Sequence, residues 1–154
     1  MNLKQISDNE LIVRLKKLTQ TERKITHLVL LHIAEIEDRM IFAELGYDGM
    51  FSYLVKEFGY SQGSAYRRLH SARLLRKVPA IAEKLESGSL NLTQLSQVQK
   101  AIREEISENK ELKKLGNDYV QAKALEVLKK IENQNSFETQ KTLAIEFNKL
   151  DCGR

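Results

Sequence analysis

Apolar residues recur at every third or fourth position through most of this chain, and few residues interrupt that rhythm. Leu, Lys and Glu are abundant, whereas the 154 residues include only one proline and seven glycines. This composition favours helix over sheet almost everywhere. A chain of this length buries most of the surface that its unfolded form exposes and is expected to form one domain. We therefore predict an all-α fold, with one compact multi-helix domain over residues 1–150 and a frayed tail over residues 151–154.

Capping residues and glycines give the expected helix boundaries. Ser7 with Glu10 and Thr19 with Glu22 match the capping-box pattern, in which a serine or threonine begins a helix. Gly59 suits the left-handed backbone at a helix end. The predicted helices cover residues 8–18, 21–43, 50–58, 62–77, 79–87, 92–108 and 118–132, with a polar junction at 110–117 and a last helix capped by Ser136.

The predicted helix over residues 21–43 carries a wide apolar stripe. Its members are Ile25, Val29, Ile33, Ile36 and Met40, widened by Leu28 and Leu31. A helix of about 22 residues spans roughly 33 Å, which is longer than a small domain needs. Either other helices pack on both sides of it, which we expect, or it pairs with a second copy of the chain.

The positive charge of the chain is concentrated in one segment. Between Phe58 and Ala82 there is no Asp or Glu. The cations of this segment are Arg67, Arg68, Arg73, Arg76 and Lys77. This excess of five positive charges is larger than the net charge of +4 of the whole chain. A local basic patch of this kind indicates contact with DNA phosphates, although a solvated basic helix that binds nothing has the same composition.

The same segment has the spacing of a helix-turn-helix over residues 50–77. We expect Leu54, Val55 and Phe58 to face inward from the first helix, and Ala65 and Leu69 to face inward from the second. Gly59 then makes the turn, and the small side chain of Ala65 lets the two helices approach closely. In such a motif the second helix enters the major groove of DNA.

The outward positions of the second helix and its basic end supply the candidate DNA-binding residues. They are Gln62, Ser64, Tyr66, Arg67, Arg68, Ser71, Arg73, Arg76 and Lys77. Gln62 and Arg67 have side chains suited to adenine and guanine edges respectively. Arg73, Arg76 and Lys77 lie further along the helix and suit contacts with phosphates, which carry no sequence information.

Two family resemblances follow from these residues. Residues 59–75, 78–81 and 85–95 resemble the helix-turn-helix core of ParB-type partition proteins. The run from about Leu11 through Phe147 resembles the helical region that precedes the nuclease domain in a family of bacterial HNH endonuclease-like proteins. That likeness rests on residues 44–47, 51–53, 65–69 and 136–140. Both resemblances imply contact with DNA.

The catalytic part of an HNH nuclease is missing from the sequence. That site needs a metal-binding histidine, a general-base histidine and an orienting asparagine. The histidines of this chain, His27, His32 and His70, all precede the place where a nuclease domain would begin. We therefore predict no catalytic residue, no metal site and no cofactor.

Other functional classes find little support in the sequence. No window approaches the roughly 18 apolar residues that a membrane span needs, and the first residues are too polar for a secretory signal. Cys152 is the single cysteine, which favours a cytoplasmic protein without disulfides. No nucleotide-binding or zinc-hydrolase motif is present, and we expect no membrane or small-molecule partner.

These observations lead to one function and one alternative. The predicted function is a non-catalytic module that binds duplex DNA through a basic recognition helix. Because one recognition helix binds weakly, tight binding requires a homodimer with two half-sites. The alternative is a protein-interaction or dimerisation module assembled through the long helix over Thr21–Ala43.

Overall fold

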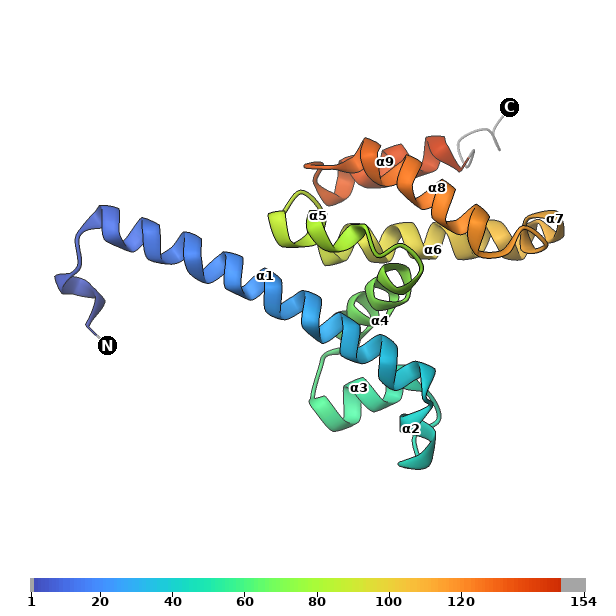
Figure 1. The fold of residues 1–154 in the computed structure, drawn as a ribbon, viewed down its shortest axis with the longest axis horizontal. Helices are drawn as coiled ribbons and strands as arrows, with labels where there is room; N and C mark the ends of the chain where they lie inside the picture. Colours follow the sequence, from blue (N-terminus) through green and yellow to red (C-terminus); the bar gives the residue numbers. More distant parts are fainter. Residues whose placement is uncertain (1, 148–154) are drawn as a thin grey trace.

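The computed structural model describes residues 2–147, which contain helices and no strand (Figure 1). The all-α prediction is confirmed. The elements are the 3-10 helix η1 (Leu3–Gln5) and the α-helices α1 (Asp8–Asp38), α2 (Ile41–Glu44), α3 (Met50–Phe58), α4 (Gln62–Lys77), α5 (Ile81–Ser87), α6 (Leu92–Glu108), α7 (Lys110–Lys113), α8 (Gly116–Ile131) and α9 (Ser136–Glu146). The expected tail over 151–154, with Cys152, lies outside the described residues.

Helix α4 forms the centre of the body (Figure 1). It packs on α6 on one side and on α1 and α3 on the other. Leu69, Leu74 and Leu75 are almost completely buried, and Ala65 and Ala72 have no exposed surface. The small side chains let neighbouring helices approach α4, while the leucines fill the space between them. Helices α8 and α9 then cover α6.

The first two predicted helices are one helix, so the predicted break between them is wrong. Helix α1 runs without interruption over Asp8–Asp38. The hydroxyl of Thr19 donates to the carbonyl of Lys16 and that of Thr21 donates to the carbonyl of Lys17, both at 2.9 Å. A threonine that bonds back to the preceding turn in this way sits inside a helix and does not cap one. The second capping-box pattern therefore marks no helix start.

The end of α1 also differs from the prediction. The helix stops at Asp38 rather than at Ala43, because Met40 has a left-handed backbone with φ of 54°. The short helix α2 follows at Ile41–Glu44. The left-handed region is costly for a non-glycine residue, so this turn is a fixed feature of the fold.

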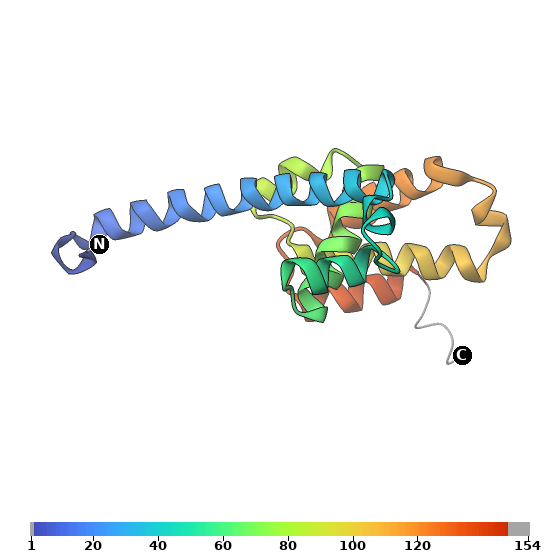
Figure 2. The same cartoon turned by 90° about the horizontal axis from the view of Figure 1, so that it is seen from below.

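The first half of α1 projects from the body as an arm (Figures 1 and 2). The buried residues of α1 are Leu30 and Ile33, which both lie in its second half. The expectation that helices pack on both sides of the predicted 21–43 helix is met only in part, because α4 and α5 pack on α1 while Ile25, Leu28 and Leu31 remain 55%, 52% and 44% exposed. Leu15 and Leu18 remain 61% and 65% exposed on the arm.

Local signals predicted the other helix ends closely. The Ser61 hydroxyl accepts from the backbone N–H of Ser64 and caps α4, and Gly59 has the left-handed φ of 73° that ends α3. Asn91 caps α6 in a complete capping box with Gln94. Three helix starts miss by one or two residues, since α8 begins at Gly116 instead of Asp118, and the predicted polar junction at 110–117 contains the short helix α7. Helix α5 begins at Ile81 instead of Pro79, and Asn135 caps α9 in place of Ser136.

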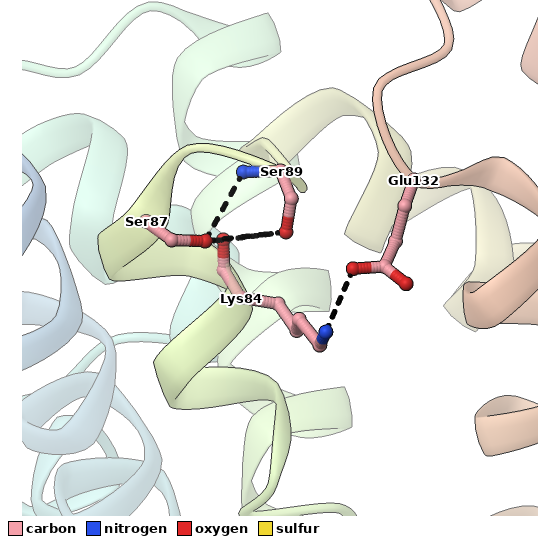
Figure 3. Close-up of polar contacts among 4 residues, drawn as sticks. All are labelled: Lys84, Ser87, Ser89 and Glu132. Carbon is pink, nitrogen blue, oxygen red and sulfur yellow. Dashed lines mark hydrogen bonds and ion pairs between the residues drawn. The ribbon is translucent and has the colours of Figure 1, made fainter.

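The turn after α5 is joined to the end of α8 (Figure 3). Lys84 forms an ion pair with Glu132 at 2.9 Å, and the Ser87 hydroxyl is bonded to that of Ser89. The backbone N–H of Asn133 donates to the carbonyl of Ser89 at 2.9 Å. Hydrogen bonding to Lys84 also holds the pKa of Glu132 below its usual value. These contacts fix the start of α6 against the α8–α9 turn.

A buried glutamine reinforces the same junction. The side-chain amide of Gln94 donates to the carbonyls of Ile131 and Gln134 at 2.8 and 2.9 Å, and it lies 3.2 Å from the Thr139 hydroxyl. Gln94 is 1% exposed. Buried carbonyls without a donor remain unsatisfied, which is costly.

No helix within residues 2–147 has the length and apolar character required to cross a membrane.

We expect Gln94→Met to destabilise the fold by about 1–3 kcal/mol. The variant keeps the bulk of the side chain but removes the donor to the Gln134 carbonyl and the acceptor for the backbone N–H of Asn91, whereas the Ile131 carbonyl still accepts from the backbone N–H of Gln134. Urea unfolding followed by circular dichroism measures the change. Gln97→Met is the matched control, since Gln97 lies on the same helix and makes only contacts of 3.5 Å with Ser136. Equal stability of the two variants would contradict this role of Gln94.

Candidate nucleic-acid interface

The predicted inward positions of α3 and α4 are only partly correct. Leu54, Ala65 and Leu69 are buried as expected, and Val55 is half-buried. Phe58 is 54% exposed and packs edge-on against Tyr53, with 5.2 Å between the ring centres. The two helices and their turn therefore exist as predicted. Their use as a DNA-binding helix-turn-helix depends on how much of α4 is open to solvent.

The first two turns of α4 remain accessible. Gln62 is exposed, and the Tyr66 ring is partly exposed. Arg67 is half-buried and makes no ion pair or side-chain hydrogen bond within residues 2–147. The Arg68 side chain is engaged within the protein. Its guanidinium carbon lies 4.7 Å from the centre of the Tyr60 ring, and its Nη1 donates to the hydroxyl and carbonyl of Ser64. Gln62, Tyr66 and Arg67 thus present polar groups that α4 itself does not use.

The prediction that Ser71 faces outward is wrong. Ser71 has no exposed surface, and its hydroxyl donates to the carbonyl of Leu92 at 3.1 Å. Helix α6 covers this side of α4, opposite the side covered by α1. A small hydroxyl at this position allows α6 to approach closely and satisfies a carbonyl in its first turn. Ser71 is therefore a packing residue.

Two of the arginines assigned to phosphates are paired with α1. The guanidinium of Arg73 contacts both carboxylate oxygens of Glu37, at 3.0 and 2.7 Å. Arg76 forms an ion pair with Asp38 at 2.6 Å and donates to the carbonyl of Ala34 at 3.1 Å. The bond to Asp38 raises the pKa of Arg76. The end of α1 thus supplies the acidic groups that the basic segment lacks in its own sequence.

A cluster of cations forms where α4 lies beside α6. Its members are Arg73, Lys77, Lys100 and Arg103, which we call the α4–α6 basic face. Arg73, Arg103 and Lys100 lie near enough to His70 to lower the pKa of that histidine. Burial, with the charge of Arg73, lowers the pKa of Lys77. Cations that gather on one surface raise the local concentration of anions there.

Two of these four cations are unpaired within the described part of the chain. Lys77 and Arg103 have no ion-pair partner there, whereas Lys100 lies 4.0 Å from Glu104 and Arg73 is bound to Glu37. Sequence reasoning missed Lys100 and Arg103 because they lie in another helix. Their spacing of three residues on one helix face was the only signal that could have found them.

His70 lies beneath this face and is buried, with 6% of its surface exposed. Its ring contacts that of Tyr66, with 4.2 Å between the centres, and its Nδ1 has no hydrogen-bond partner. Burial, followed by the charges of Arg73 and Arg103, lowers the pKa of His70 from 6.5 to about 4. The ring is therefore neutral at neutral pH and supports the Tyr66 ring from below.

No group of three or more His, Cys, Asp or Glu side chains within residues 2–147 is placed to hold a metal ion. The histidine–carboxylate pair that the structure does form is His27 with Glu86, at 3.5 Å. The absence of catalysis stays a prediction from the sequence.

We expect His70 to make the fold less stable in acid. Because its folded pKa is about 4 and its unfolded pKa about 6.5, its contribution is fully present above roughly pH 6.5 and declines as the pH falls towards about 4. The decline by about pH 4.5 is roughly 2 kcal/mol. Urea unfolding of the protein and of His70→Gln across this range measures it. The variant should lose less stability on acidification than the wild type. Parallel curves for His70→Gln and wild type would contradict the assignment.

In comparisons with known proteins, no protein-family model, no curated protein and no solved structure matches this chain. The resemblances to HNH-associated and ParB-type regions therefore remain expectations from the sequence.

Proposed function

We propose that this protein is a non-catalytic, cytoplasmic DNA-binding module that contacts duplex DNA through the α4–α6 basic face. The observation that carries the proposal is that α4 packs against α6 and brings the cations Arg73, Lys100 and Arg103 of the two helices around the buried His70, with Lys77 one helical turn beyond Arg73. Lys77 and Arg103 have no partner within residues 2–147, so a phosphate would compete with no carboxylate for them. Lys and Arg are the side chains that neutralise DNA phosphates.

The packing of α4 shapes the proposed mode of binding. A recognition helix contacts base edges through residues near its N-terminus, and the rest of α4 packs against α1 and α6. Binding would therefore depend on backbone phosphates along the basic face. Gln62, Tyr66 and Arg67, on the accessible turns of α4, are the residues left to contact bases or sugars. This arrangement favours affinity that depends on salt and varies little with sequence.

The two sequence resemblances support the same class of ligand. Both families work on DNA. The ParB-like residues 59–75 include the turn before α4 and the start of that helix, and the HNH-associated likeness includes residues 65–69 of the same helix. In this proposal the chain acts as the positioning half of an HNH-type system.

We expect binding to random duplex DNA to weaken as salt increases. The triple variant Lys77→Ala, Lys100→Ala, Arg103→Ala should flatten the slope of log affinity against log salt by roughly 0.9 for each phosphate that the variant no longer neutralises. Fluorescence anisotropy at several salt concentrations measures both slopes. The matched control replaces three lysines away from the face, Lys113, Lys114 and Lys129, and should change the slope little. Absence of DNA binding at low salt, or equal slopes for the two triple variants, would refute the proposal.

Removing the acid that neutralises Arg73 should have the opposite effect. Glu37→Gln keeps the shape of the side chain but removes the charge that holds Arg73. Arg73 then becomes available to one more phosphate, so affinity at low salt should increase and the slope should steepen by about 0.9. Asp38→Asn is the control. It removes the carboxylate that pairs with Arg76, and Arg76 is not a member of the basic face. Weaker binding by Glu37→Gln, with the helical circular dichroism unchanged, would count against the basic face.

A further inference from the structure

A regular apolar stripe follows one face of α1 along almost its whole length. Its positions are Leu11, Leu15, Leu18, Glu22, Ile25, Val29, His32 and Ile36, separated alternately by four and three residues. This spacing is the heptad repeat of helices that pair along their length. Six of the eight positions are apolar, and the polar ones, Glu22 and His32, lie in its middle and second half.

The arm part of the stripe has no covering element within residues 2–147. Leu15, Leu18 and Ile25 are 61%, 65% and 55% exposed, and the arm stands apart from the body in both views (Figures 1 and 2). Scattered exposed leucines are common on protein surfaces, whereas a contiguous apolar patch indicates an interaction site. The arm therefore presents a surface with the regularity of an interface.

The stripe continues into a groove on the body. Near the chain start, Leu3 lies beside the first stripe residues. Further along α1, Ile25, Val29 and Ile36 form one wall of the groove. Residues of α3 and the turn after it form the other wall, namely Met50, Leu54, Phe58 and Tyr60. Leu18 and Glu22 line the passage between arm and groove, with Tyr60 and Arg68 opposite them. One surface thus joins an exposed helix to a groove lined by apolar side chains.

We propose that a second copy of this chain covers this surface, with the two α1 helices antiparallel and the arm of each copy lying in the α1–α3 groove of the other. The groove is lined by apolar side chains in the same four–three repeat along α1, so it is complementary to a helix with that repeat. The arm is such a helix. Each chain presents both halves, so a twofold axis satisfies the arm and the groove of both copies at once. This inference is independent of DNA binding, since the stripe and the basic face share no residue.

Glu22 decides the orientation. In a parallel, in-register pair the two Glu22 carboxylates would meet at the centre of the seam, where like charges repel. In the antiparallel register that sets Leu18 opposite Val29 of the second copy, Leu15 faces His32, and Glu22 faces Ile25 near Arg68. The same register brings Arg14 beside Glu35 of the second copy, which gives opposite charges at the edge of the seam.

Light scattering after size exclusion tests the dimer with the full chain. We expect a mass near twice 17.8 kDa. The double variant Leu15→Glu, Leu18→Glu should raise the dissociation constant at least about 100-fold, because it places charges in the seam of both copies. The helical circular dichroism should remain, since both residues are exposed on the arm. Val13→Glu is the control, because Val13 is 49% exposed but lies on the opposite face of α1. A monomeric wild type, or equal weakening by Val13→Glu, would overturn the proposal.

Cysteine cross-linking tests the orientation, in a background with Cys152→Ser. Mixed samples of Leu15→Cys and His32→Cys should form the 15–32 disulfide between chains on mild oxidation. Cross-linking of Leu15→Cys to itself, without the mixed product, would overturn the antiparallel arrangement. Because this readout needs no DNA, its failure is distinguishable from failure of the proposed function.

Discussion

The burial of α4 on two opposite sides is the constraint on which the rest of the structure depends. Leu69, Leu74 and Leu75 are buried on α4, which packs against both α1 and α6. This packing of α1 and α6 on α4 brings Glu37 and Asp38 of α1 to Arg73 and Arg76 of α4. It also places Lys100 and Arg103 of α6 near His70 of α4. The hydrogen bonds of the Gln94 side chain then join α6 to the α8–α9 turn and fix the position of α8 and α9 relative to α6.

The same packing changes what the basic segment can do. In the sequence, residues 58–82 are a block of uncompensated positive charge. In the fold, α1 pairs with two of its arginines, and α6 contributes two new cations beside Lys77. The result is a smaller basic face made by two helices, which suits phosphates better than it suits insertion into a groove. His70 stays neutral beneath it because protonation would add a buried charge among cations.

Within residues 2–147, other α-helices pack only on the part of α1 that lies against the body (Figure 1), whereas the apolar stripe continues onto the arm. In the proposed dimer, the arm and the groove belong to one repeat that extends along nearly the whole 31-residue helix α1. A twofold pair of chains would carry two basic faces, and the stripe and the faces are separate. The two proposals can therefore succeed or fail independently.

The sequence by itself determined the local features of this protein. It predicted the all-α class and the bounds of α3, α4 and α6, because apolar periodicity and caps such as Ser61 and Asn91 act within a few residues. It could not decide whether Thr19 begins a helix or lies inside one. The Thr19 hydroxyl has a hydrogen-bond partner either way, a backbone N–H at a helix start or the carbonyl of the preceding turn within a helix. It also misplaced Ser71 and left the partners of Arg73 and Arg76 unknown. Those outcomes depend on helices about 20 to 40 positions away in the chain, and only tertiary packing brings them into contact.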